Sequence, residues 1–156
     1  MAEDTKDPLV FAFFNEIGII AQLSQTLLGR SLPDGLRMSH FGVLNHFARR
    51  GGEQNPAELA RAFQVTKGAM TNTLQRLEAR GLVEVRPDPR DGRGKRVRLT
   101  KKGLRARDKA IAALAPAMAG LEARFAARQF RGALPFLQQV RTYLDEARDA
   151  PEGKAG

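Results

Sequence analysis

The stretch NPAELARAFQVTKGAMTNTLQRLEARGLVEV, residues 55–85, decides the fold. It opens with Asn-Pro-Ala-Glu, a strong helix start, because Asn caps a helix, Pro suits its first position and Glu can bond back to the cap. We expect this helix to end near Gln64. Thr66 caps a further helix, which we expect to run to about Arg80 and to stop at Gly81. Two short helices with so tight a connection predict a helix-turn-helix.

The hydrophobic period changes after this second helix, from a helical repeat to alternation. Residues 82–86 and 96–100 place apolar side chains at every second position, which is typical of strands. Residues 87–94 between them are rich in turn formers and cations. The pattern predicts a β-hairpin with a long basic tip, so that the helices and the hairpin together form a winged helix-turn-helix.

Two amphipathic helices precede this unit. Residues 8–28 repeat apolar side chains at helical spacing, with Pro8 in the first turn. A loop over residues 30–37 follows, and Ser39 is the expected cap of the second helix, which the glycines at 51–52 terminate. The apolar stripe of the first helix consists of Val10, Phe13, Phe14, Ile17, Ile20, Ala21, Leu27 and Leu28.

Two further helices are expected after the hairpin. A long helix starts at about Lys101, and Pro116 should kink it or mark a local break. The last helix covers roughly residues 133–147, where Pro135 is tolerable only in the first turn. These amphipathic helices need a surface to pack on, which is either the first helix or a second subunit. Their stripes consist of Leu104, Ile111, Leu114, Met118, Leu121 and Phe125, and of Leu134, Leu137, Val140 and Leu144.

The order of elements predicts a mainly α fold with a small β-hairpin wing. We expect a single domain over residues 8–148, with flexible tails at residues 1–7 and 149–156. The parts of this domain are a winged helix-turn-helix DNA-binding lobe over residues 36–103 and dimerisation helices over residues 8–30 and 104–148.

Positive charge is concentrated in one third of the chain. Residues 61–107 contain fourteen Lys or Arg and four Asp or Glu, a net charge of +10, whereas the remaining residues carry −1. This segregation indicates a lobe that binds a polyanion on a near-neutral scaffold, and a solvated basic face is the simpler alternative. The chain has no cysteine, which excludes disulfides, thiolate metal sites and thiol redox sensing.

No segment has the composition of a membrane span. The most apolar stretch, residues 9–28, is interrupted by Asn15, Glu16 and Gln22 among other polar residues. The first residues are acidic, which is the wrong charge for a secretory signal. We therefore expect a cytoplasmic protein with no membrane partner.

Two runs in the basic third resemble the MarR family of bacterial transcriptional regulators. Residues 66–83 look like the family's recognition helix and its exit. Residues 88–103 look like its wing signature, an Asp-Arg-Arg triplet followed by a Leu-Thr-x-x-Gly strand exit that ends at Gly103. With the flanking helices included, the resemblance covers about residues 8–148.

The chain departs from the family pattern at two positions within these runs. Asp91 and Arg93 match the first and third residues of the wing triplet, but Gly92 differs at the second. In the recognition helix, Thr71 matches a frequent Thr, and Asn72 stands where many members carry Arg. These departures affect individual base contacts and leave the expected fold unchanged.

The resemblance implies a triangular helical homodimer in which the terminal helices form the interface and two winged lobes bind successive grooves of double-stranded DNA. The family mostly represses transcription, and many members release DNA when a small, often phenolic or anionic, ligand binds between the lobes. Two-fold symmetry of the protein then matches a pseudopalindromic operator. The resemblance thus implies a repressor released by a ligand, with no cofactor.

Side-chain chemistry suggests how each expected contact would act. Thr71, Asn72 and Gln75 suit base edges, and Arg93 suits a minor groove. Asp91 would be repelled by DNA, so we expect it to pair with an Arg and to fix the wing. The remaining cations suit phosphates, while Thr66 also serves as a helix cap. The full expected DNA-binding set is Thr66, Lys67, Gly68, Thr71, Asn72, Gln75, Arg76, Arg86, Arg90, Arg93, Lys95 and Arg96.

A ligand site is expected by resemblance, for a small organic anion held between the lobes. A zinc site at the two histidines is disfavoured, because His40 and His46 are six residues apart on one helix and the chain has no cysteine. We find no catalytic arrangement and expect no enzyme activity and no metal. The predicted ligand pocket consists of Phe14, Ile17, Arg37, His40 and Phe41.

Three classes of function remain open on the sequence alone. The first is a sequence-specific repressor, which the uncharged polar groups of the recognition helix favour. The second is an architectural protein that binds any duplex with similar affinity. The third is a winged-helix module whose basic wing binds an acidic protein.

Overall fold

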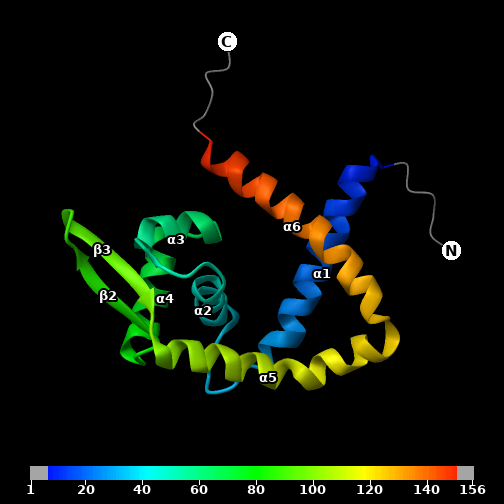
Figure 1. Cartoon of the computed structure of the whole chain (residues 1–156), viewed down its shortest axis with the longest axis horizontal. Coiled ribbons are helices and arrows are strands. Elements are labelled where there is room, and N and C mark those ends of the chain that lie inside the picture. Colours follow the sequence, from blue (N-terminus) through cyan, green and yellow to red (C-terminus); the bar gives the residue numbers. More distant parts are fainter. Residues whose placement is uncertain (1–6, 151–156) are drawn as a thin grey trace, which may run out of the picture.

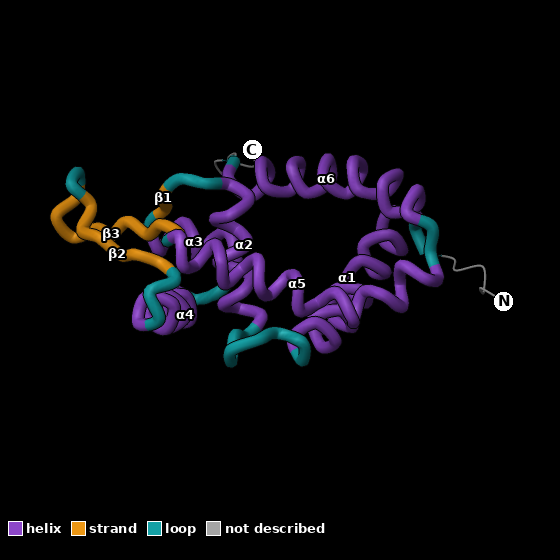
Figure 2. The backbone as a smooth tube through the Cα atoms, turned by 60° about the horizontal axis from the view of Figure 1, so that its bottom comes forward, coloured by secondary structure: helices purple, strands orange, loops and turns teal. Residues whose placement is uncertain are grey.

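The computed structural model describes residues 7–150, which form six helices and a small sheet (Figure 1). The residues from α2 to β3 form a winged lobe at the beginning of α5, and α6 turns back at the far end of α5 to cross α1 (Figures 1 and 2). The mainly α fold with a small wing is confirmed. Most of the tails predicted to be flexible, residues 1–6 and 151–156, lie outside the described residues.

Helices α3 and α4 begin at residues whose side-chain oxygens accept hydrogen bonds from the first free backbone amides of the helix. Helix α3 (Pro56–Phe63) has the predicted reciprocal cap, in which the Glu58 amide donates to Asn55 Oδ1 at 2.7 Å and the Asn55 amide donates to Glu58 Oε2 at 3.0 Å. Helix α4 (Lys67–Ala79) has the predicted Thr66 cap. The cap predicted at Ser39 was wrong, because α2 (Met38–Arg50) begins two residues before the start that this cap implies and has Arg37 at its cap position.

The wing is a three-stranded antiparallel sheet of order β1-β3-β2. Strands β2 (Val83–Asp88) and β3 (Asp91–Leu99) stay paired up to Asp88 and Asp91, so the predicted long tip over residues 87–94 was wrong and the turn is short. Pro87 is tolerated because β2 is an edge strand, and a bulge at Pro87/Asp88 absorbs the irregularity. Strand β1 (Glu53–Gln54) was not predicted.

The core lies inside the winged lobe. Seven side chains are almost fully buried there and come from α2, α3, α4 and the two long strands. Helix α5 (Lys101–Arg124) adds Ala110 to this cluster, and Arg107 on α5 donates to Asn45 Oδ1 on α2 at 3.0 and 3.1 Å. Helix α5, which follows β3 directly, is therefore packed firmly on the lobe. The seven side chains are Val43, Leu44, Phe47, Leu59, Leu77, Val83 and Val97.

The prolines of the two outer helices each carried a prediction. Helix α5 runs unbroken through Pro116, so of the two predicted outcomes, a kink or a local break, the break is absent. Helix α6 (Ala127–Asp149) begins six residues before the predicted start, which places Pro135 in the helix interior and contradicts the first-turn prediction. The early start has a local cause, because Gln129 Oε1 accepts a hydrogen bond of 2.9 Å from the Ala126 amide.

Helix α1 (Leu9–Gly29) and helix α6 contain no buried residue, although both carry large apolar side chains. Leu9 is 85% exposed and Leu23 is 67% exposed on α1, and Leu134 is 51% exposed on α6. Phe13 and Phe136 do touch where the two helices cross, with ring centroids 5.4 Å apart. Much of each apolar stripe is therefore left uncovered by the chain itself.

No single helix in the described residues is both long and apolar enough to span a bilayer. Helices α5 and α6 satisfy the length and composition of a span only as a pair, and they are bent by 107° relative to each other.

Candidate nucleic-acid interface

Helix α4 is oriented by its buried side. Met70, Leu74 and Leu77 are buried in the lobe core at helical spacing, so the opposite side of the helix faces solvent. All seven residues of α4 and its cap that were predicted to contact DNA are exposed. They are Thr66, Lys67, Gly68, Thr71, Asn72, Gln75 and Arg76.

Two of these side chains are already connected to each other. Arg76 Nε donates to Asn72 Oδ1 at 3.3 Å, across one turn of α4. The bond leaves the two amide hydrogens of Asn72 and the terminal guanidinium nitrogens of Arg76 free for bases or phosphates. Asn72 and Arg76 are therefore exposed on the outer side of α4 as a hydrogen-bonded pair.

The wing arginines divide into two groups. Arg86 lies 3.4 Å from Glu53 and 3.3 Å from Glu84, and Arg96 lies 3.8 Å from Glu53 and 4.0 Å from Asp88. These two cations, predicted to contact DNA, are therefore engaged within the wing. Glu53 was not predicted to have a role, because a two-residue polar strand carries no periodic signal and only its pairing with β3 places it beside these arginines.

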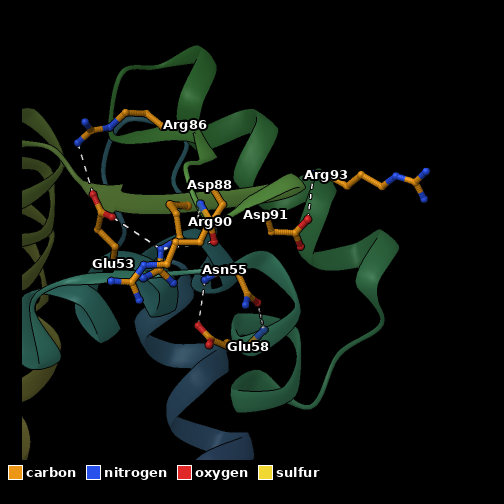
Figure 3. Close-up of polar contacts among 9 residues, drawn as sticks. Glu53, Asn55, Glu58, Arg86, Asp88, Arg90, Asp91 and Arg93 are labelled. Carbon is orange, nitrogen blue, oxygen red and sulfur yellow. Dashed lines mark hydrogen bonds and ion pairs between the residues drawn. The ribbon is translucent and has the colours of Figure 1, made fainter.

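The second group forms no ion pair with the wing carboxylates. In the described part of the chain, no ion pair involves Arg90, Arg93 or Lys95. The side chain of Arg93 extends away from the other labelled residues, whereas that of Arg86 points toward Glu53 (Figure 3). These three cations are thus the part of the wing that is free to meet an anion.

Two carboxylates shape the turn that carries these cations. Asp88 Oδ1 accepts a hydrogen bond of 2.9 Å from the Arg90 amide, and Asp91 Oδ1 accepts one of 3.1 Å from the Arg93 amide (Figure 3). Asp91 was predicted to pair with an arginine. In the structure its carboxylate binds the backbone amide of Arg93 and not a guanidinium group. Its contact still fixes the wing turn locally.

The free wing cations and helix α4 border the same hollow. A concavity of about 420 Å³ is lined by Lys67 and Thr71 from α4, by the start of α3, and by Arg93 and Lys95 from the wing together with the carboxylates of Asp88 and Asp91. The structure therefore brings the two predicted binding elements together on one face.

The residues predicted to bind a ligand lie on α1 and α2, which contact each other. Phe14 is exposed, Ile17 and Phe41 are half-buried, and Arg37 is exposed. His40 is buried, and its Nδ1 accepts a hydrogen bond of 3.1 Å from the Arg37 amide. One nitrogen of this imidazole is thus occupied by the start of α2.

The second histidine joins α2 to the wing. His46 Nε2 lies 2.6 Å from Gln54 Oε1 on β1, and its ring contacts Phe63 with centroids 5.3 Å apart. Burial lowers the pKa of His46, and burial together with the charge of Arg37 lowers the pKa of His40. Both imidazoles are therefore held neutral at pH 7.

These lowered pKa values predict that the protein loses stability in acid. Below the ordinary histidine pKa of 6.5, the unfolded chain binds protons that the folded chain excludes, so the free energy of unfolding falls as the pH falls. Urea unfolding at about pH 7.5 and about pH 5.5, where most carboxylates stay ionised, measures this loss.

The variant His46→Gln is the matched control, because its amide does not titrate. We expect a smaller loss between the same two pH values in this variant. A free energy of unfolding that stays constant or rises on acidification would contradict the prediction.

Comparison with known proteins finds a likeness that covers most of the lobe. The sequence model described as MarR family matches residues 34–94. The multiple antibiotic resistance protein MarR of Salmonella typhimurium is 36% identical over 88 residues, which is 56% of this chain and 60% of that protein. The matched region thus spans less than two thirds of this curated relative.

Solved structures extend the likeness to the outer helices. Wild-type MarR from E. coli in its apo form is 27% identical with a TM-score of 0.71, covering 88% of this chain and 98% of that one. A mutant of E. coli MarR complexed with operator DNA is also 27% identical, with a TM-score of 0.64, and covers 86% of this chain and 99% of that one.

Proposed function

We propose that this chain is a transcriptional repressor of the MarR family, which it resembles in sequence and fold, that it binds a pseudopalindromic operator as a homodimer, and that a small molecule releases it. The observation that carries the proposal is the shared face of α4 and the wing. Thr71 lies on it beside Arg93 and Lys95 of the wing, and the uncharged side chains of Asn72 and Gln75 are exposed on the same helix. The relative solved with operator DNA has the same fold.

In this proposal the two elements have different tasks. Helix α4 lies in the major groove, where Thr71, Asn72 and Gln75 contact base edges. Arg93 enters the neighbouring minor groove, and Arg90 and Lys95 contact phosphates. The exposed start of α4, which includes Thr66, Lys67 and Gly68, binds a phosphate, because its free backbone amides can donate hydrogen bonds to the phosphate oxygens. Arg86 and Arg96 add to phosphate binding only where DNA competes with their carboxylate partners.

Binding to specific DNA tests this function against the architectural alternative. Footprinting on the DNA upstream of the chain's own coding region should show a protected site with two-fold symmetry. Titration should then show affinity for that site at least about 10³-fold above a scrambled duplex at physiological salt. Equal affinity for both duplexes supports an architectural protein, and no DNA binding at moderate salt supports a module for an acidic protein.

Dimerisation follows from the uncovered stripes on α1, α5 and α6. A second copy would cover these side chains, which one chain leaves exposed, and burial of each large apolar side chain contributes about 1.5–3 kcal/mol. We propose that residues 8–30 and 104–148 form this interface and that residues 36–103 form the DNA-binding lobe.

Light scattering at micromolar concentration should give about twice the chain mass of 17.2 kDa. The variant Leu134→Asp, which places a charge in the α6 stripe, should shift the mass toward one chain while the lobe stays folded. A monomeric parent protein would contradict the dimer.

Release by a small organic anion is the remaining part of the proposal. The family resemblance supports a ligand of this class, and the absence of cysteine rules out a thiol sensor in its place. The location beside Phe14, Ile17, Arg37, His40 and Phe41 stays a prediction.

A further inference from the structure

Charged side chains form a continuous row on the outer face of the wing sheet. Val83 and Val97 are buried on the core face, so their neighbours along β2 and β3 point the other way. Each arginine of the row lies within 4.0 Å of a carboxylate, and three arginines balance three carboxylates. In order, the row consists of Arg98, Glu84, Arg86, Glu53, Arg96 and Asp88.

Glu53 occupies a central place in this row, between two arginines. Arg86 and Arg96 are direct register partners on β2 and β3, and like charges at such positions destabilise a sheet. Glu53 Oε1 accepts a hydrogen bond of 3.4 Å from Arg86 Nη2 (Figure 3), and Glu53 Oε2 lies 3.8 Å from Arg96 Nε. One carboxylate thus offsets the repulsion between two guanidinium groups.

The backbone that carries Glu53 belongs to the lobe and not to the hairpin that carries the arginines. Its strand β1 lies between α2 and α3, and its register partner on β3 is Arg98. The next residue, Gln54, lies 2.6 Å from His46 on α2, and Asn55 caps α3. The position of the carboxylate is therefore fixed by α2, α3 and β3 together.

The wing thus has a neutral base and a positive tip. We propose that Glu53 limits the sequence-independent part of polyanion binding, because it holds Arg86 and Arg96 and leaves only the tip cations free. Phosphates are alike in every DNA sequence, so each wing cation that is free to bind them adds affinity for any duplex. Within the described residues, the wing cations without an ion pair are Arg90, Arg93 and Lys95.

Glu53 acts through the two arginines and is a positioning residue. Breaking an exposed ion pair costs up to about fivefold in an equilibrium constant, so a phosphate that displaces Glu53 gains correspondingly less. The consequence for DNA rests on the proposed function, whereas the restraint on the two arginines does not.

The variant Glu53→Gln tests the restraint, because it removes the charge and keeps the size of the side chain. At about 0.1 M salt we expect its affinity for a scrambled duplex to rise about fivefold per subunit. The salt slope should steepen by about one unit for each arginine that gains a phosphate. A purely structural role predicts the opposite, since a loosened wing would bind less. Unchanged or weaker binding by a folded variant would overturn the proposal.

Glu78→Gln is the charge-matched control on the same lobe. Glu78 is exposed on α4 and forms no ion pair within the part of the chain that the structure describes. An equal gain in this variant would show a general effect of charge and refute a role of Glu53. Adding Arg86→Gln and Arg96→Gln to Glu53→Gln should abolish the gain, and a gain that persists would also refute it.

A second comparison leaves Glu53 in place and serves if its variant does not fold. Removing Arg86 and Arg96 together from the parent should weaken binding to scrambled DNA less than removing Arg90 and Lys95 together, because the first two are already held by carboxylates. Equal losses would contradict the restraint. Circular dichroism confirms that each variant is folded.

Heparin chromatography separates this inference from the proposed function, because heparin is a polyanion without bases. Glu53→Gln should elute at higher salt than both the parent and Glu78→Gln. If the parent binds no duplex at any salt but Glu53→Gln shows this shift, the proposed function fails and the restraint stands. If the parent distinguishes its operator from scrambled DNA but Glu53→Gln leaves the salt slope and the elution unchanged, the restraint fails and the proposed function stands.

Discussion

Replacing Asn72 with alanine is expected to bring the affinities for operator and scrambled DNA closer together, by about 1–3 kcal/mol for each half-site. The Asn72 amide is exposed on the outer side of α4, and its natural partner is adenine, with which it can form two hydrogen bonds. Both subunits of a dimer lose this contact. The loss falls mainly on the correct operator, because scrambled DNA does not offer the matching base at that position.

The matched comparison is Arg93→Ala on the wing. A minor groove distinguishes A·T from G·C pairs only, so this variant should weaken binding to operator and scrambled DNA alike. It should also lower the salt slope of binding by about one unit per subunit. Titration of both duplexes at several salt concentrations separates the two effects.

The hydrogen bond from Arg76 to Asn72 adds a further test. If Asn72 acts only by orienting Arg76, then adding Asn72→Ala to Arg76→Ala should cost nothing more. We expect an additional loss of specificity, because Asn72 retains free amide hydrogens. An unchanged affinity ratio in Asn72→Ala, or normal binding of scrambled DNA by Arg93→Ala, would refute the division between helix and wing.

The second large effect is expected at Gly103, where the variant Gly103→Ala should lose about 3 kcal/mol of unfolding free energy. A Cβ atom at this position would overlap the carbonyl oxygen of Leu82 and lie 2.7 Å from Leu99 Cδ1. Backbone on one side and a core-packed side chain on the other leave little room to adjust. At an uncrowded helix position, replacing glycine with alanine would instead raise the free energy of unfolding by about 1 kcal/mol. A loss of stability therefore shows that Gly103 is tightly packed.

Gly68→Ala on α4 is the control, because Gly68 also lies in a helix but outside the residues proposed to form the dimer interface. No atom lies within 4 Å of a Cβ at this position, so the variant should be neutral or slightly more stable. Thermal and urea unfolding of both variants at one protein concentration gives the comparison. Equal stability of Gly103→Ala and the parent would show that the wing exit is not tightly packed.

The Leu-Thr-x-x-Gly run was identified by its resemblance to the family, and the contacts of Thr100 and Gly103 give it a structural basis. Thr100 Oγ1 donates to the Gly81 carbonyl at 2.7 Å and accepts from the Gly103 amide at 2.9 Å. One threonine thus caps α5 and ties it to the end of α4. Local signals of this kind, like the caps at Asn55 and Thr66, act within a few residues and were predicted correctly.

Features that depend on distant partners could not be predicted in the same way. Strand β1 exists because Glu53 and Gln54 pair with Arg98 and Val97, far along the chain. The turn-forming residues 87–94 indicated a loop, yet pairing across the hairpin keeps most of them in strands. The pairing of β1 with β3 also brings Glu53 beside Arg86 and Arg96. It therefore decides which wing arginines form ion pairs and which do not.

The unbroken course of α5 has a mechanical consequence. This helix of 24 residues is about 36 Å long at 1.5 Å per residue, and it joins the wing exit directly to the bend before α6. A small rotation of this helix about the bend would become a larger displacement at the wing. A rotation of about 5° at the bend displaces the wing end by about 3 Å, close to the ~3.4 Å rise of one base pair. In a dimer that contains two such helices, a rotation of this size would change the separation of the two wings by roughly one base-pair step for each subunit.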